Sequence, residues 1–252
     1  MTQRSLFDDD RPANPGTISS GAGARPEGSL TRVREPDPAY TPEERSARMA
    51  AVREQALVCT RCELCQTRTH VVFGEGTVTT PLVLVGEGPG ETEDATGRPF
   101  VGRAGKLLDA VLAENGMTRQ HIYLCNVLKC RATLVEDGRL QNRPPRVEEA
   151  AACRDWLDTQ LAIIRPMVIL CLGSPAANAI IHPNFALTRE RGQWFTHCPY
   201  APWVMAAFHP AYILRKHDAG YDAARASLVR DIGAARLKVV ELRKAAKAIA
   251  GQ

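Results

Sequence analysis

The stretch PLVLVGEGPG at residues 81–90 decides the fold of this chain. A short apolar run that ends in a glycine-rich turn is typical of a buried strand followed by a loop. Similar apolar runs at 122–127, 168–172 and 203–208 predict three more strands. Segments with helical spacing lie between the four runs, at 104–114, 147–164 and 175–181. This alternation predicts an α/β domain with a mostly parallel sheet.

The two ends of the chain differ from this core. Thr41-Pro42-Glu43-Glu44 is a capping box with proline at the first helical position, and it predicts a helix to about residue 58. The alanine-rich segment 221–248 predicts a long terminal helix. Residues 1–40 are rich in proline, glycine, serine and charge, so we expect a disordered tail. We therefore expect a single domain at 41–252.

The composition excludes several classes of protein. Of 252 residues, 44% are hydrophobic and 24% charged, close to the average of globular domains and unlike fibrous or wholly disordered chains. The apolar run 167–172 is far shorter than the roughly 18 residues of a membrane span. The first ten residues lack the basic start and apolar core of a secretory signal. We expect a cytoplasmic monomer, whose net charge of +4 permits a polyanionic partner.

Polar residues follow the predicted strands where each strand ends. Glu87 follows the first, Asn126 the second, the Gly173-Ser174 turn the third, and His209 the fourth. Ligands of parallel sheets bind outside the carboxyl ends of the strands. A lone histidine or asparagine is more often structural, but the joint position of these groups predicts a binding site at one rim of the sheet.

The turn after the first strand is not a common nucleotide-binding loop. It lacks the Gly-Lys-Ser/Thr of a Walker loop, and Pro89 with the acidic run behind it would obstruct a pyrophosphate. The segments 86–102, 126–131 (NVLKCR) and 209–215 (HPAYILR) instead resemble, in the same order, the motifs of family 4 uracil-DNA glycosylases. These are the iron–sulfur members of the uracil glycosylase superfamily. The resemblance covers roughly residues 55–235.

This resemblance implies a three-layer α/β/α fold with a central four-stranded, mostly parallel sheet. It also implies an enzyme that hydrolyses the N-glycosidic bond of deoxyuridine in DNA, releases uracil and starts base-excision repair. Such an enzyme must rotate the nucleotide out of the duplex, because the bond cannot be reached inside the base stack.

The matched motifs imply a role for each residue. Glu87 would position the attacking water or stabilise the cationic sugar. Asn126 would read the amide edge of uracil, and His209 would donate a hydrogen bond to uracil O2. Three further residues are expected to contact the base: Gly88 by close backbone approach, Phe100 by stacking, and Glu93 by crowding the methyl group of thymine.

The segment after His209-Pro210 is expected to contact DNA. Ile213 or Leu214 would fill the gap that the flipped base leaves, and Arg215 and Lys216 would meet phosphates. Without the preceding His-Pro, an ordinary amphipathic loop would be the better interpretation. We also expect Lys129 and Arg131 to reach the DNA backbone.

Eight cysteines in a reducing compartment do not indicate a disulfide framework. Those in polar surroundings resemble metal or cluster ligands, and those in apolar runs resemble core residues. The resemblance implies that Cys59, Cys62, Cys130 and Cys153 hold a [4Fe–4S] cluster. Cys65 extends the first pair to C-x-x-C-x-x-C and departs from the family pattern. A structural zinc site is the alternative, since spacing alone does not separate the two.

Other functions stay open at this point. A related subgroup traps uracil-DNA covalently through a histidine in an extra loop, but the matching stretch 187–195 has no histidine before His197. A turnover enzyme is therefore favoured over a trapping binder. A cysteine-cluster redox or nucleic-acid-binding protein is the third hypothesis. In the tail, Gln3-Arg4-Ser5-Leu6-Phe7 resembles the peptide that binds the bacterial sliding clamp, although a chance match is the commoner explanation.

Overall fold

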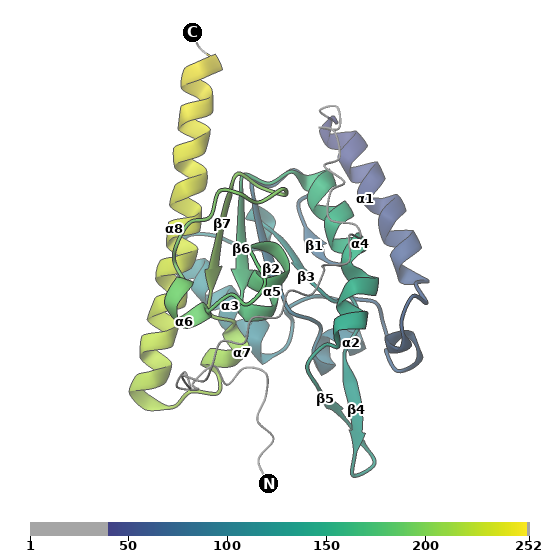
Figure 1. The fold of residues 1–252 in the computed structure, drawn as a ribbon. Coiled ribbons are helices and arrows are strands. Elements are labelled where there is room, and N and C mark those ends of the chain that lie inside the picture. Colours follow the sequence, from purple (N-terminus) through teal and green to yellow (C-terminus); the bar gives the residue numbers. More distant parts are fainter. Residues whose placement is uncertain (1–39, 251–252) are drawn as a thin grey trace, which may run out of the picture.

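A central sheet covered by helices on both faces forms the body of the molecule (Figure 1). The computed structural model describes residues 40–250. The predicted tail, with its Gln3–Phe7 motif, therefore lies outside the described residues apart from Tyr40.

The sheet contains the four predicted parallel strands. These are β2 (Leu82–Gly86), β3 (Tyr123–Asn126), β6 (Val168–Leu172) and β7 (Trp203–Ala207), in the spatial order β3-β2-β6-β7. A short fifth strand, β1 (Glu75–Gly76), adds to the outer edge of β3 in antiparallel orientation. The expected four-stranded parallel sheet is thus confirmed, with one small edge strand added.

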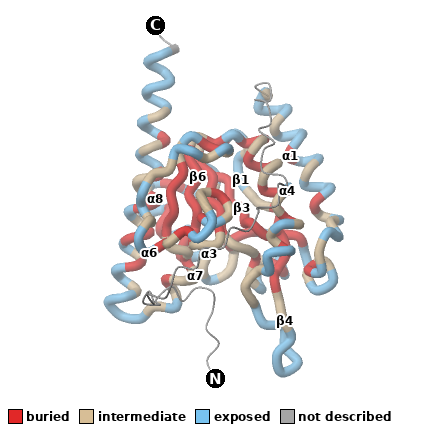
Figure 2. The backbone as a smooth tube through the Cα atoms, in the orientation of Figure 1, coloured by how far each residue is buried: buried red, intermediate tan, exposed pale blue. Residues whose placement is uncertain are grey.

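Alternate side chains of each strand enter two separate cores, as the period of a strand requires. In β2, Val83 and Val85 pack on one face and Leu82 and Leu84 on the other. All four are almost inaccessible to solvent, because helices cover both faces of the sheet (Figure 2).

The predicted helices are present with nearly the expected bounds. The first face is covered by α1 (Pro42–Leu57), α4 (Val147–Ile164) and α5 (Ser174–Ile180), and the second by α3 (Arg103–Glu114) and α8 (Asp218–Ala250). The capping box at Thr41 and Glu44 is formed as the sequence indicates. Within the described residues, no helix is long and apolar enough to cross a membrane.

Several short elements were not predicted. They are α2 (Glu91–Thr96), α6 (Leu187–Glu190), α7 (Pro210–Ile213), the 3-10 turns η1 (Glu63–Gln66) and η2 (Arg119–His121), and the hairpin of β4 (Thr133–Glu136) and β5 (Arg139–Asn142). Three of them, α2, the hairpin and α7, connect a strand end to the next long helix, so they determine the shape of the predicted rim.

Candidate active site

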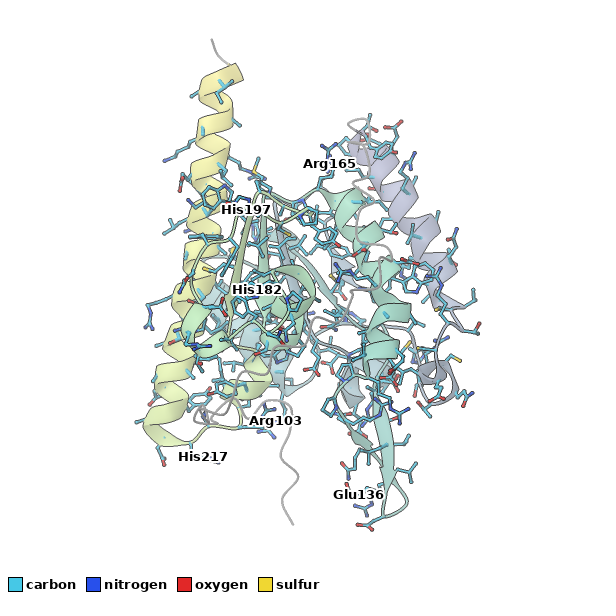
Figure 3. The ribbon with its side chains drawn as sticks, in the orientation of Figure 1. Arg103, Glu136, Arg165, His182, His197 and His217 are labelled. Atoms are coloured by element: carbon cyan, nitrogen blue, oxygen red, sulfur yellow. The ribbon has the colours of Figure 1, made fainter. Side chains whose placement is uncertain are left out.

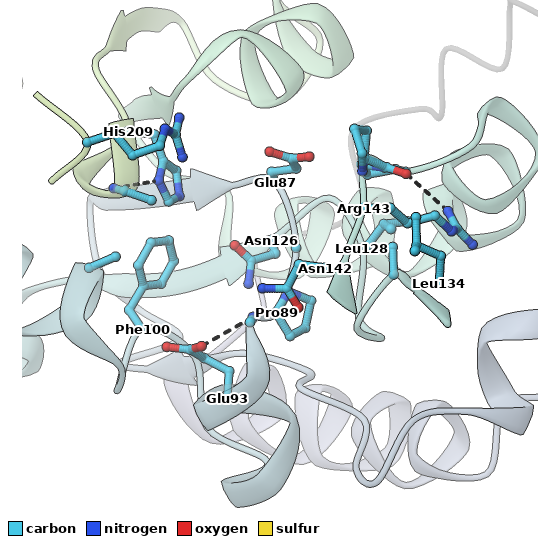
Figure 4. A pocket seen from close by; sticks show the side chains of 18 residues that line it. Glu87, Pro89, Glu93, Phe100, Asn126, Leu128, Leu134, Asn142, Arg143 and His209 are labelled. Carbon is cyan, nitrogen blue, oxygen red and sulfur yellow. Dashed lines mark hydrogen bonds between the residues drawn. The ribbon is translucent and has the colours of Figure 1, made fainter. Parts of the chain in front are cut away.

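The polar residues at the strand ends surround one cavity of about 560 Å³ (Figure 4). Glu87 follows β2, Asn126 ends β3 and His209 follows β7, and all three line the cavity. This volume is in the range of small-molecule binding sites. Gly173 does not line the cavity, but it makes room for His209: a Cβ added there would lie 3.2 Å from the His209 Cβ, at a φ of +90°.

Asn126 has the most informative hydrogen bonding in the cavity. The residue is 2% exposed, and among the described residues its Oδ1 is the one buried side-chain nitrogen or oxygen atom that has no hydrogen-bond partner. Leaving such an atom unpaired costs free energy. An unpaired amide oxygen at a cavity wall therefore indicates a ligand that donates the missing hydrogen bond. Gly86 makes this placement possible, since a Cβ there would lie 2.4 Å from Asn126 Oδ1.

His209 is held as a neutral imidazole with a defined tautomer. Its Nδ1 accepts a hydrogen bond from the backbone N–H of Ala211 at 3.0 Å. Burial, with a smaller effect of the Arg215 charge, lowers the pKa of His209 to about 4. A neutral ring that accepts at Nδ1 carries its proton on Nε2. His209 therefore offers an N–H donor to whatever occupies the cavity.

Phe100 forms the wall beside His209, with ring centroids 5.8 Å apart. Its backbone φ of 54° lies in the left-handed region that non-glycine residues rarely adopt. The guanidinium of Arg119 donates to the Phe100 carbonyl, and Gly105 of α3 packs directly on that carbonyl. Strained backbone of this kind persists where the surroundings impose it, often at ligand sites.

Glu87 presents a carboxyl group to the centre of the cavity (Figure 4). Burial raises the pKa of this carboxyl to about 7, and the positive charge of Arg215 partly offsets that effect. A carboxyl and an imidazole whose pKa values are displaced in opposite directions share this cavity. Such pairs are typical of catalytic sites.

Glu93 also lines the cavity, but its carboxylate is engaged with the backbone. It accepts hydrogen bonds from the N–H groups of Val101 and Gly102 at 2.8 Å each, and from Gly90 at 3.2 Å. Glu93 thereby joins the glycine-rich turn to the loop that carries Phe100. Gly88 lies opposite Leu128, and a Cβ there would meet Leu128 at an ordinary 3.4 Å.

The predicted DNA-contacting segment lies on α7 and the turn after it. Ile213 is 0% exposed and belongs to the core, so in this structure it is not at the surface to fill a gap in DNA. Leu214 and Lys216 are partly exposed, and Arg215 is exposed at the cavity wall. Leu214 is therefore the better candidate for the apolar wedge.

The prediction that Lys129 and Arg131 reach DNA is wrong for Lys129. Its side chain is 1% exposed, and Nζ donates to the Asn126 carbonyl at 2.7 Å and to Gln160 Oε1 at 2.6 Å. Arg131 is 8% exposed and donates from Nε to Asn142 Oδ1 at 2.6 Å. Charged side chains are usually solvated. Here both are buried, and they hold Asn126 and Asn142, two residues of the cavity wall, by hydrogen bonds.

The hairpin supplies cavity residues that the sequence interpretation missed. Leu134, Asn142 and Arg143 line the cavity from β4, β5 and the segment after them. Arg143 is held by a short ion pair with the buried Glu149. An Asp-Gly pair between two short strands is a hairpin signal, so Asp137-Gly138 could have revealed this element.

Four of the five candidate cysteines line a second, smaller cavity. They are Cys59, Cys62, Cys130 and Cys153, which come from three separate segments of the chain; Cys65 is not among the lining residues. Burial raises the pKa of the Cys130 thiol to about 11, and the guanidinium of Arg68, which donates to its Sγ at 3.3 Å, partly offsets this.

The same cavity has a backbone donor. The N–H of Lys129 donates to Cys153 Sγ at 3.2 Å. Across the residues that the structure describes, no three His, Cys, Asp or Glu side chains converge closely enough to hold a single metal ion.

Comparisons with known proteins agree with this geometry. Residues 73–233 match the family model described as the uracil DNA glycosylase superfamily. The chain is 45% identical over 180 residues to a type-4 uracil-DNA glycosylase of Thermotoga maritima, covering 70% of this chain and 86% of that protein. It is 41% identical over 172 residues to the one of Archaeoglobus fulgidus, covering 65% and 81%. For the one of Sulfurisphaera tokodaii, identity is 38% over 176 residues, covering 65% and 74%.

Proposed function

Because this chain belongs to the uracil DNA glycosylase superfamily, we propose a role in uracil release for each residue of its cavity. The chain is a monofunctional uracil-DNA glycosylase of DNA repair. It hydrolyses the bond between uracil and deoxyribose. The observation that supports the site best is the buried Asn126 Oδ1 without a partner, beside a neutral histidine donor.

The flipped base is held by stacking on an aromatic ring and by hydrogen bonds to its amide edge. Phe100 supplies an aromatic wall, and Asn126 Oδ1 accepts the uracil N3–H while its amide nitrogen donates to O4. Cytosine presents an acceptor at N3 and a donor at N4, so the same amide would be left unpaired. A mismatch of this kind supports discrimination of roughly 10⁴-fold or more.

The bond breaks as electrons move into the base. When the C1′–N1 bond breaks, its electron pair enters the uracil ring, and the negative charge on O2 is stabilised by the His209 Nε2–H. The sugar becomes cationic, and the Glu87 carboxylate stabilises that charge across the cavity. Water then adds to C1′ and loses a proton to Glu87, which leaves an abasic site. The uracil anion takes up a proton and leaves as free uracil, and Glu87 returns its proton to solvent.

We place Glu93 and Gly88 in supporting roles. The Glu93 carboxylate holds the loop at Val101 and Gly102 in place. This loop, positioned by Glu93, crowds the site that the methyl group of thymine would occupy. Gly88 leaves space at the cavity wall for the base. Leu214 and Arg215 meet the DNA around the flipped nucleotide, together with Lys216.

Four cysteines fit a [4Fe–4S] cluster. Cys59, Cys62, Cys130 and Cys153 line one cavity, and N–H groups donate to the sulfurs of Cys130 and Cys153. A structural zinc ion held by the same four sulfurs is the alternative. When bound, the cluster would supply a covalent tie between the segment around residue 60, the end of β3 and α4.

The direct test uses oligonucleotides with one uracil. Single-stranded and duplex substrates are incubated with the protein, and free uracil is measured together with alkali-cleavable abasic sites. Matched thymine and cytosine oligonucleotides serve as controls. We expect uracil release from the uracil substrates only and without a gel-stable adduct. An adduct would favour a trapping binder, and indifference to uracil would contradict the enzyme.

A clamp contact through the Gln3–Phe7 peptide remains part of the proposal. Deleting residues 1–10 should abolish association with the sliding clamp and leave activity on short oligonucleotides unchanged. A full-length protein that does not bind the clamp would contradict it. We expect the enzyme to act as a monomer on cytoplasmic, chromosomal DNA.

A further inference from the structure

The β4–β5 hairpin is rooted in the uracil cavity and extends beyond the body of the molecule. Its base carries Leu134 and Asn142, which line the cavity. Its tip projects from the end of the sheet where α2 and α7 also lie, and Figure 3 places Glu136 there (Figures 1 and 3). Each strand has four residues, so the hairpin reaches roughly 13 Å from its base.

This position brings the hairpin against the substrate. His209, which precedes α7, and Leu134, on the hairpin, line opposite parts of the same cavity (Figure 4). A base seated between them leaves its flanking nucleotides at that end of the molecule. The hairpin extends from the cavity at this end, so nucleotides that flank a bound base come within its reach.

The tip carries an exposed apolar pair. Val135 and Leu140 face each other across the two strands, and they are 72% and 45% exposed. Asp137 and Gly138 connect the strands, both with positive φ, as a tight two-residue turn requires. A two-stranded ribbon of this kind has the width that the major groove of DNA admits.

The charge of the hairpin excludes phosphate attraction as the source of a DNA contact. Residues 133–142 carry two carboxylates, Glu136 and Asp137, and one guanidinium, Arg139, which gives a net charge of −1. Such a tip gains nothing from contact with phosphates, so a contact with DNA must come from its apolar pair, and the major groove offers apolar thymine methyl groups. Apolar side chains also insert at base steps.

We propose that the β4–β5 hairpin enters the major groove of the duplex beside the flipped uracil and holds it through Val135 and Leu140. The inference rests on the proposed function. It adds a second DNA-contacting element on the opposite side of the cavity from α7, one that acts on duplex rather than on single strands.

The test is the double variant Val135→Ser/Leu140→Ser. Affinity is measured with a uracil duplex that carries a 2′-fluoro sugar to resist cleavage, and with the corresponding single strand. We expect the duplex Kd to rise about tenfold, equivalent to about 1.4 kcal/mol, and the single-strand Kd to stay within twofold. The salt dependence should keep its slope, because no phosphate contact is lost.

The matched control is Leu237→Ser/Ile249→Ser, which removes two exposed apolar side chains (62% and 75% exposed) from α8. It should leave the duplex Kd unchanged. Cleavage by trypsin after the exposed Arg139 gives an independent readout: the duplex should protect this site and the single strand should not.

An unchanged duplex Kd in the hairpin variant, or equal losses on both substrates, would overturn the inference. Failure of the proposed function is distinguishable, because the wild-type protein would then release no uracil from either substrate.

Discussion

At the scale of single residues, burial in the cavity shifts the pKa values of two groups in opposite directions. Burial raises the pKa of the Glu87 carboxyl to about 7 and lowers that of His209 to about 4. Burial disfavours the charged form of each group, so the two shifts have opposite directions. Around neutral pH, His209 is therefore a neutral donor while Glu87 changes its charge.

This difference predicts the pH profile. The proposed chemistry needs the Glu87 carboxylate, which forms as pH rises through its pKa. We expect kcat/KM to increase with pH up to about 7 and then level off, with no further change from His209 between about pH 5 and 9. The measurement is uracil release from a short duplex across this range. In Glu87→Gln the step near pH 7 should vanish; a flat wild-type profile would reject the role of Glu87.

His209 is predicted to contribute through a single hydrogen bond. The variant His209→Ala removes one preorganised donor at uracil O2, so single-turnover uracil release should fall roughly 10²–10³-fold. It also removes the acceptor for the Ala211 N–H, which lowers the free energy of unfolding by only about 1 kcal/mol. Thermal unfolding followed by circular dichroism checks that the variant is folded. Turnover near that of the wild type would contradict the assignment.

At the scale of elements, the start of α3 determines the position of Phe100. Gly105 lies so close that an added Cβ would be 1.6 Å from the Phe100 carbonyl oxygen. No other residue fits without moving the loop that forms the stacking wall. Helix packing thus controls the geometry of the base site from outside the cavity.

The variant Gly105→Ala tests this link. It should lower the free energy of unfolding by about 1–3 kcal/mol through overpacking, and it should slow uracil release because Phe100 is displaced. Chemical denaturation and single-turnover rates measure the two effects. Gly220→Ala is the control, at the same third position of α8, where the nearest atom to an added Cβ is 4.0 Å away. Similar behaviour of the two variants would contradict the argument.

At the scale of the whole molecule, the cysteine cavity joins segments that are distant in the chain. Cys59 and Cys62 follow α1, Cys130 follows β3, and Cys153 lies in α4. Lys129 lies between this cavity and the base site, because its N–H donates to Cys153 and its Nζ donates to the Asn126 carbonyl. A cluster bound in this cavity would therefore support the strand end that carries Asn126.

Loss of one ligand should show in colour and in stability together. The purified protein should be brown and absorb broadly near about 400 nm. Cys130→Ala should lose this absorbance and its iron, and its Tm should fall. Cys198→Ala removes a partly buried thiol outside both cavities and should keep the iron. A colourless wild-type protein that contains zinc would remove the iron proposal.

Local sequence patterns were sufficient to predict the main strands and helices and the polar residues at the strand ends. The four parallel strands and the main helices were predicted within a few residues, because periodicity and capping are local properties. Parallel strands end at one edge of a sheet, so Glu87, Asn126 and His209 could be predicted to share a site. The hairpin was missed, since its strands are short and nearly all exposed and therefore lack a clear apolar period.

The sequence by itself determined the order of strands and helices, the motif residues and the set of cysteines that could bind a cluster. Only the tertiary structure decided that Lys129 and Ile213 are buried, and that Cys65 lies outside the cavity that the four other thiols line. It also decided that the hairpin forms part of the wall of the base site. The physical reason is that burial depends on what distant segments pack against a residue, and no neighbouring sequence encodes that packing.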